Sequence, residues 1–153
     1  KTFNGPWMRG YEFQIIQGGV GDLLVLGGYE PDGSVIQCAA TVTTIKDRDG
    51  ETVWASNGKA EEFQSGRINW WGRDVGWDDR LGFRGRQDVE SPDGEWTRIE
   101  TICADDTLDY YVNGQRVNYA SRLSHKAGRL IFQSEGAEIF FRKIELHPLP
   151  AAK

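Results

Sequence analysis

The sequence predicts an all-β protein, and three observations support that prediction. Apolar and polar residues alternate with a period of two in several segments, which places them on opposite faces of a strand. The 19 glycines stand singly or in pairs between these segments, as turns require. No long segment has the 3.6-residue period of a helix. We therefore expect many short antiparallel strands packed as two sheets.

Length and charge narrow the possible functions. A chain of 153 residues is long enough for one well-cored domain, residues 1–153, and too short to expect two. The formal net charge of −5 argues against a nucleic-acid partner, because phosphate binding normally needs a basic face. No apolar run reaches membrane-spanning length, and no signal peptide is visible.

The first strand is expected at residues 11–16. Its large apolar residues at alternate positions would lie on the core, and Glu12 and Gln14 would share the other face. On a rigid strand this pair can bind a polyhydroxylated ligand, with Glu12 as acceptor or acid/base and Gln14 as donor and acceptor. An ordinary solvated face is the alternative, and this segment alone does not choose between them.

Further strands follow along the chain. A turn containing Asp22 precedes the next strand, and the segment at 60–63 is the one helix-like turn. We expect the remaining strands at residues 23–26, 35–45, 52–55, 67–71, 96–103, 107–113, 116–119, 130–133 and 138–146.

Several strands carry hydrogen-bonding or aromatic side chains on their predicted non-core faces. Alternation places Ile68, Trp70, Leu130 and Phe132 inward, and it places outward Arg67, Asn69, Trp71, Arg98, Glu100 and Gln133. Sugars need this mixture, because hydroxyls pair with planar polar groups and the apolar sugar face stacks on an indole. The alternative is that Arg98 and Glu100 merely pair on a solvated face.

The segment at 70–80 holds three tryptophans, two arginines and three aspartates. So many indoles are costly to expose to water, so the loop is expected to pack on itself or to meet a ligand. Arg73 and Trp71 are its candidate ligand contacts.

The sequence gives little support for a metal site or a disulfide bond. Cys38 and Cys103 lack metal-ligand spacing and are expected to be buried thiols, with a disulfide as the second option. His125 and His147 are far apart, which argues against a histidine metal site. The turn at 47–50 resembles half of a calcium loop without its closing Glu, so we predict no cofactor and keep calcium as the alternative.

Four stretches of the chain resemble the 3-keto-disaccharide hydrolase family, long known as a bacterial domain of unknown function. The first is Tyr-Glu-Phe-Gln-Ile-Ile-x-Gly-Gly-x-Gly-Asp at residues 11–22. The others lie at residues 66–74, at 94–100 with Tyr-Val-Asn-Gly downstream, and at 130–146. The resemblance runs over residues 7–149. It implies a concanavalin A-like jelly roll of two antiparallel sheets, related in fold to glycoside hydrolase family sixteen, and an exported protein, secreted or periplasmic.

The resemblance also implies cleavage of glycosides oxidised at the sugar 3-position. A 3-keto group acidifies the C2 hydrogen, so a base can drive elimination of the aglycone, which hydration then follows. Glu12 would be the base, with Glu100 as second carboxylate and Arg98 or Arg67 on a hydroxyl or oxyanion. We expect the substrate contacts to come from Gln14, Asp22, Asn69, Trp71, Arg73 and Gln133.

The chain departs from the family pattern in two ways. Family members usually begin with several more strands, so the first strands are expected to be missing and an open sheet edge could allow self-association. Family members often carry a His where this chain has Glu135. The alternative function, from another class, is a non-catalytic carbohydrate-binding or adhesion module.

Overall fold

The structure is a computed structural model that describes residues 2–3 and 7–150. Within these residues the chain forms strands, turns and irregular segments but no helix, and hence no helix that could span a membrane. The strands are β1 (Thr2–Phe3), β2 (Trp7–Met8), β3 (Gly10–Phe13), β4 (Leu23–Leu26), β5 (Gly28–Tyr29), β6 (Val35–Ile36), β7 (Ala40–Lys46), β8 (Thr52–Trp54), β9 (Lys59–Phe63), β10 (Gly66–Ile68), β11 (Ile99–Ala104), β12 (Thr107–Val112) and β13 (Gln115–Ala120).

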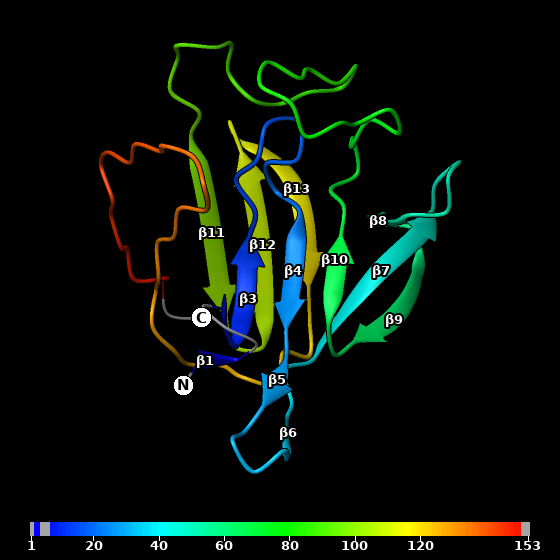
Figure 1. Ribbon diagram of the computed structural model, residues 1–153, viewed down its shortest axis with the longest axis vertical. Helices are drawn as coiled ribbons and strands as arrows, with labels where there is room; N and C mark the ends of the chain where they lie inside the picture. The colour runs from blue at the N-terminus through cyan, green and yellow to red at the C-terminus, as the bar shows by residue number, and fades with distance from the viewer. Residues whose placement is uncertain (1, 4–6, 151–153) are drawn as a thin grey trace.

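Two three-stranded antiparallel sheets pack face to face. One has the order β10-β4-β3 and the other the order β11-β12-β13, and Figure 1 shows the first lying in front of the second. The ring of Phe13 on β3 stacks on Tyr110 of β12, with ring centroids 4.4 Å apart. This all-β arrangement is compatible with the jelly-roll sandwich that the sequence predicts.

A third sheet, β8-β7-β9, extends the sandwich on one side (Figure 1). An antiparallel bridge between Thr41 and Ser121 joins β7 to the end of β13, and a parallel bridge between Val53 and Asn69 joins β8 to the chain after β10. The third sheet is therefore bonded to both layers.

The core lies between the layers, where strands of both sheets bury alternate residues. β12 alternates between half-buried and buried positions, and β4 does the same in the opposite sheet. Fully burying one large apolar side chain contributes about 1.5–3 kcal/mol. The best-buried residues of the core include Leu23, Val25, Ile68, Trp70, Tyr110, Val112 and Val117.

Two elements differ from the sequence prediction because of the distant segments with which they form hydrogen bonds. The helical turn predicted at 60–63 is wrong, since this segment is β9 and pairs with β7, with Ala40 opposite Phe63. The strand predicted at 35–45 is divided into β6 and β7. Between them the backbone of Ala39 bonds to the side chains of Tyr11 and Ser124 instead of joining a ladder.

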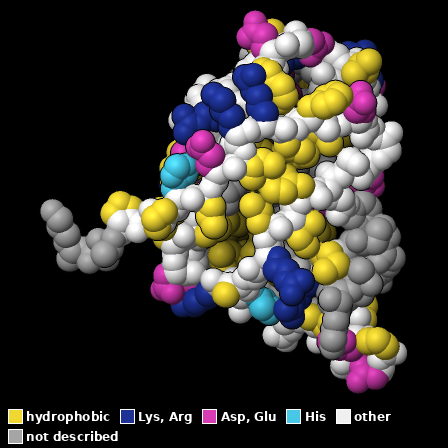
Figure 2. Space-filling model, turned by 90° about the vertical axis from the view of Figure 1, so that its left-hand side faces the viewer, with side chains coloured by type: hydrophobic (Ala, Val, Ile, Leu, Met, Phe, Trp, Pro, Cys, Tyr) yellow, Lys and Arg dark blue, Asp and Glu magenta, His cyan; other side chains and the backbone are white. Residues whose placement is uncertain are grey.

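The strands predicted at 130–133 and 138–146 are absent. The segment is irregular, and Leu130 and Phe132 are 73% and 46% exposed, so the prediction that they face the core is wrong. Side chains of the segment instead contact aromatic rings. Phe132 lies edge-on to Phe141, and the Arg142 guanidinium lies 4.1 Å from the Trp96 ring centroid. Figure 2 shows hydrophobic side chains gathered around a hollow on this side of the molecule. An alternating pattern forms a strand only where a neighbouring strand supplies the ladder.

The prediction of buried thiols is right for Cys38 and wrong for Cys103, which is exposed. Both are free cysteines. Cys103 lies on β11, an edge strand, where the inward-facing side is incompletely covered.

Candidate functional site

Glu12 and Arg67 stand on either side of Leu24 in one row across three strands. Glu12 on β3 pairs with Leu24 on β4, and Leu24 pairs with Arg67 on β10. Directly opposed residues point to the same face of a sheet, and Phe13, next to Glu12, points to the core. The row therefore lies on the outer face of the sheet. Because neighbouring strands lie about 4.8 Å apart, the two outer backbones are about 10 Å apart, with a half-buried leucine between them.

Gln14 and Asp22 extend the same face beyond the row. The Gln14 N–H donates to the Asp22 carbonyl at 3.0 Å, and the Gly21 N–H donates to the Gln14 carbonyl at 3.0 Å. These bonds continue the β3–β4 pairing, so the side chains of Gln14 and Asp22 lie on the same face of the sheet as those of Glu12 and Leu24. The structure thus brings four predicted site residues, Glu12, Gln14, Asp22 and Arg67, to one face.

The Asp22 carboxylate is fully buried and multiply bonded. It forms an ion pair with Arg73, accepts the Trp70 N–H at 2.9 Å and lies 3.9 Å from Nε of Arg67. Burial raises the pKa of Asp22 to about 6, against the lowering effects of Arg73, the Trp70 N–H and Arg67. Asp22 thus anchors two arginines at the edge of the row.

Arg73 is held in place by the residues around its guanidinium group. The group lies 3.9 Å from the ring centroid of Trp77, and the Arg73 side chain is only 3% exposed. A Cβ added at Gly19 would collide with Nη1 of Arg73. The absence of a side chain at position 19 is therefore what allows the guanidinium to reach Asp22.

Glu12 has the properties of a base that is stronger than an ordinary surface carboxylate. Burial raises the pKa of Glu12, the nearby charge of Glu135 raises it further, and Arg67 lowers it. Glu135 in the C-terminal segment therefore acts on Glu12 electrostatically, which the sequence alone did not reveal.

The tryptophan-rich segment packs on the turn between β3 and β4. Trp70 Nε1 donates to the Gly18 carbonyl at 3.1 Å, and Trp77 Nε1 donates to the Gln17 carbonyl at 2.8 Å. The Gln17 side chain in turn accepts the Gly82 N–H at 2.6 Å. In Figure 1 this long segment after β10 lies over the same end of the sandwich as the turn. Trp70 and Trp77 therefore pack within the protein, which is the first of the two alternatives that the sequence left open for this loop.

Sequence reasoning missed Glu90, which also supports the turn. Its Oε1 accepts the N–H groups of Gly18 and Val20 at 2.7 and 3.4 Å. Burial raises the pKa of Glu90 to about 7, the charge of Asp88 adds to this rise, and the two N–H groups oppose it. Glu90 lies in an irregular segment without periodicity, so no local sequence signal could have marked it.

Glu100 and Arg98 are not brought to Glu12. Glu100 pairs with Tyr111, next to Tyr110, which faces the core. Glu100 therefore points to the outer face of the sheet β11-β12-β13, with the sandwich between it and Glu12. It forms an ion pair with Arg98 at 3.0 Å, and both side chains are well exposed. This is the alternative in which Arg98 and Glu100 pair on a solvated face.

Asn69 and Gln133 also lie apart from the row. Asn69 is buried and donates to Glu51 Oε2 at 2.6 Å, so its amide is engaged within the protein. Gln133 is exposed in the irregular C-terminal segment.

Trp71 and Arg73 line an open pocket with a volume of about 170 Å³. Trp71 remains 39% exposed, and its Nε1 donates to the Arg116 carbonyl at 2.8 Å. Glu12 and Gln14 do not line this pocket, whose other residues are Arg48, Gly72, Asp74, Val75, Arg86 and Gln87.

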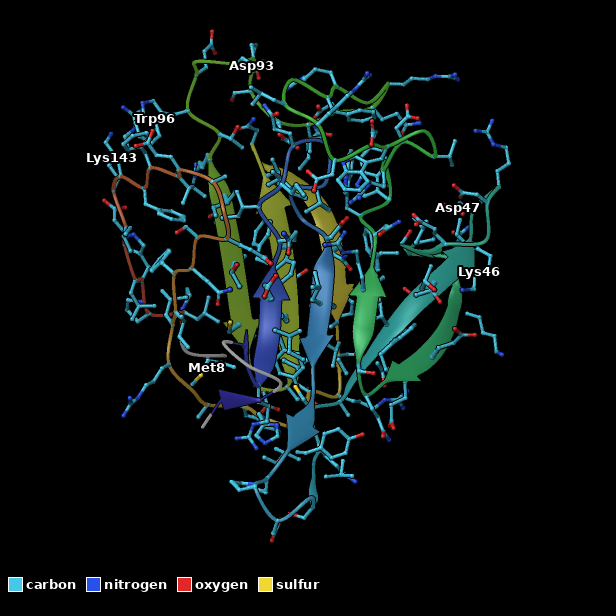
Figure 3. The ribbon with its side chains drawn as sticks, viewed as in Figure 1. Met8, Lys46, Asp47, Asp93, Trp96 and Lys143 are labelled. Carbon is cyan, nitrogen blue, oxygen red and sulfur yellow. The ribbon has the colours of Figure 1, made fainter. Side chains whose placement is uncertain are left out.

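An acidic cluster lies at the tip of the β7–β8 hairpin, where Figure 3 labels Asp47. Carboxylate oxygens of Asp47, Asp49 and Glu51 lie within 4.8 Å of one another. Glu51 supplies a third carboxylate to the half-loop that the sequence suggested, but Asn69 Nδ2 donates to one of its oxygens. The prediction of no cofactor, with calcium at this turn as its alternative, stays a prediction.

Comparison with known proteins bears on the family of the chain. Residues 1–147 match the model of the 3-keto-alpha-glucoside-1,2-lyase-like domain. Neither the comparison with curated proteins nor that with solved structures gave a match. The family match confirms the resemblance stated from the four sequence stretches. Because it spans nearly all of the sequence, the chain belongs to the 3-keto-alpha-glucoside-1,2-lyase-like domain family.

Proposed function

We propose that the protein cleaves glycosides whose sugar is oxidised at C3, by eliminating the group at C1 and hydrating the product. The row Glu12–Leu24–Arg67 is the observation that supports this proposal most directly. It offers a carboxylate and a guanidinium group on either side of an apolar floor, on a sheet that holds all three rigidly. A keto-sugar ring lying over Leu24 would have one charged group at each side.

Glu12 acts as the base in this proposal. It takes the C2 proton, and the electrons of the C2–H bond form an enolate with the C3 carbonyl. The enolate collapses to restore the C3 carbonyl, a double bond forms between C1 and C2, and the C1–O bond breaks. The leaving oxygen takes up a proton, and addition of water across the double bond yields the free 3-keto sugar.

Arg67 stabilises the enolate oxygen as it becomes negatively charged. A cationic donor that is oriented before the reaction acts most strongly on charge that develops in the transition state. Asp22, 3.9 Å from Nε of Arg67, helps to hold that orientation. Glu135 lies close enough to act on Glu12 electrostatically, and in its protonated form it is the candidate acid for the leaving oxygen, since Glu100 lies on the other face.

Glu12→Gln tests the proposal with a p-nitrophenyl 3-keto-glucoside and with 3-keto-trehalose. Loss of a general base lowers rates by about 10²- to 10⁴-fold, so product release should fall by that factor. Exchange of the C2 hydrogen in deuterated water, followed by NMR, should disappear in parallel. Glu62→Gln, at an exposed position on β9, is the matched control and should react like the parent.

Full turnover by Glu12→Gln would overturn the assignment of the base. Binding of the 3-keto sugar by the parent protein without turnover or exchange would instead establish a non-catalytic carbohydrate-binding module.

A further inference from the structure

The pocket beside Trp71 combines an exposed indole with two arginines that have no acidic partner of their own. Within the described residues, the guanidinium groups of Arg48 and Arg86 form neither an ion pair nor a hydrogen bond. Arg73, the third arginine of the pocket, is already paired with Asp22. The pocket therefore holds two cationic groups that are available to a ligand.

The acidic residue of the pocket is largely engaged by backbone groups. Asp74 Oδ1 accepts the Gly76 N–H at 2.9 Å, and Oδ2 accepts the Arg86 N–H at 3.2 Å. These two bonds hold the pKa of Asp74 below its usual range, with smaller contributions from Arg86 and Arg48. Among the residues that line the pocket, one carboxylate thus faces two guanidinium groups, and the acidic cluster of Asp47, Asp49 and Glu51 that flanks Arg48 is not part of the lining.

The indole of Trp71 is fixed in position. Its Nε1 bonds to the Arg116 carbonyl, and its ring lies edge-on to Trp70 with centroids 5.3 Å apart. A Cβ added at Gly72 would collide with the Trp70 ring and lie 3.2 Å from Cβ of Gln87, so the glycine lets these groups close the pocket wall. A rigid aromatic surface costs little ordering when a ligand binds.

Two separate parts of the fold form the pocket. Arg48 comes from the tip of the β7–β8 hairpin, next to Asp47 in Figure 3, and the other lining residues come from the segment after β10. The pocket adjoins the proposed reaction site through Arg73, which lines the pocket and pairs with Asp22. Its volume of about 170 Å³ is well below the roughly 300–1,000 Å³ of sites for drug-sized ligands, so one sugar unit is the matching size.

We propose that this pocket is a binding subsite for a carboxylate-bearing sugar, a uronic acid unit carried by the substrate. The sugar ring would stack on Trp71, and Arg48 and Arg86 would bind the carboxylate, a group that the planar guanidinium matches in geometry. Gln87 would pair with a ring hydroxyl. The role of the pocket in the reaction rests on the proposed function. The binding of a uronic acid to the pocket does not depend on turnover.

The test measures binding of methyl glucuronide and methyl glucoside to the full chain by titration calorimetry and tryptophan fluorescence. Methyl glucuronide should bind, and methyl glucoside should bind much more weakly. Arg48→Met and Arg86→Met should each weaken glucuronide binding about 10- to 100-fold, as expected for loss of a charge-assisted hydrogen bond. Arg129→Met, at an exposed position outside the pocket, is the matched control and should bind like the parent.

Equal affinity for glucoside and glucuronide, or unchanged binding by both arginine variants, would overturn the proposal. Equally tight binding of inorganic sulfate would also overturn it, because the pocket would then bind anions without recognising a sugar. Both arginines are exposed, so circular dichroism should show that the variants remain folded. The same titration with Glu12→Gln should give parental affinity, which separates failure of this subsite from failure of the proposed reaction.

Discussion

Asp22 and Arg73, 51 positions apart in sequence, form a buried ion pair that joins the turn after β3 to the tryptophan-rich segment. Both side chains are almost completely removed from water. The pair also fixes the neighbourhood of Arg67, because Asp22 lies between the two arginines. Removing one partner of such a pair leaves an uncompensated buried charge.

Arg73→Met should therefore lower the free energy of unfolding by about 3–5 kcal/mol, as measured by urea denaturation. The double variant Asp22→Asn, Arg73→Met should recover part of this loss, because no buried charge then lacks a partner. A loss below about 1 kcal/mol in the single variant would show that Arg67, 3.9 Å away, or water compensates the charge of Asp22.

Gly19→Ala tests the close approach of Arg73 to the turn. The added methyl group would collide with Nη1 of Arg73 and lie 2.8 Å from Cγ2 of Ile16. We expect the free energy of unfolding to fall by about 1–3 kcal/mol, as for other overpacked sites. Gly128→Ala, where no atom lies within 4 Å of the added Cβ, should leave it nearly unchanged. Equal stabilities of the two variants would argue against this packing.

Glu90 should make the protein less stable as the pH rises. Its pKa is about 7 in the folded protein against an ordinary value of 4.5, so the folded chain holds the proton more tightly. The stabilisation is fully present below pH 4.5 and is lost as the pH rises to 7. Glu90→Gln keeps an oxygen acceptor for Gly18 and Val20 but has no charge. At pH 8 it should be more stable than the parent by about 1–2 kcal/mol, after allowance for partial solvent screening.

Denaturation curves at several pH values between 4 and 8 measure this difference. Glu95→Gln, at an exposed position, should keep the parental pH dependence. A parental slope in Glu90→Gln would assign the pH dependence to other groups, with Asp22 the first to examine.

The pH dependence of turnover should respond in opposite directions to the two charges around Glu12. If ionised Glu12 is the base, kcat/KM rises with pH as Glu12 loses its proton. Glu135 raises the pKa of Glu12 and Arg67 lowers it. Glu135→Gln should therefore move the acidic limb of the profile to lower pH, and Arg67→Met should move it to higher pH. Both variants should also lower the rate, because Glu135 is the candidate acid and Arg67 the group that stabilises the enolate oxygen. Shifts in the same direction would exclude Glu12 as the group that controls this limb.

The sequence alone determined the elements whose pattern is local. The alternation in residues 11–16 predicted β3, the short apolar run at 23–26 predicted β4, and the alternation in 107–113 predicted β12, because these patterns are properties of consecutive residues. The same reasoning placed Glu12 and Gln14 on one face of their strand, and four local stretches were enough to indicate the family.

Only the tertiary structure decided which of these side chains meet. Glu12 and Arg67 share a row because both strands pair with Leu24, whereas Glu100 has an equally regular pattern but belongs to the opposite sheet. Likewise, residues 60–63 became a strand because β7 offered a ladder, and residues 138–146 did not because no strand in the described part of the chain pairs with them. The physical reason is that hydrogen bonds between distant segments decide which strands pair and which side chains share a face of a sheet. No single segment contains that information.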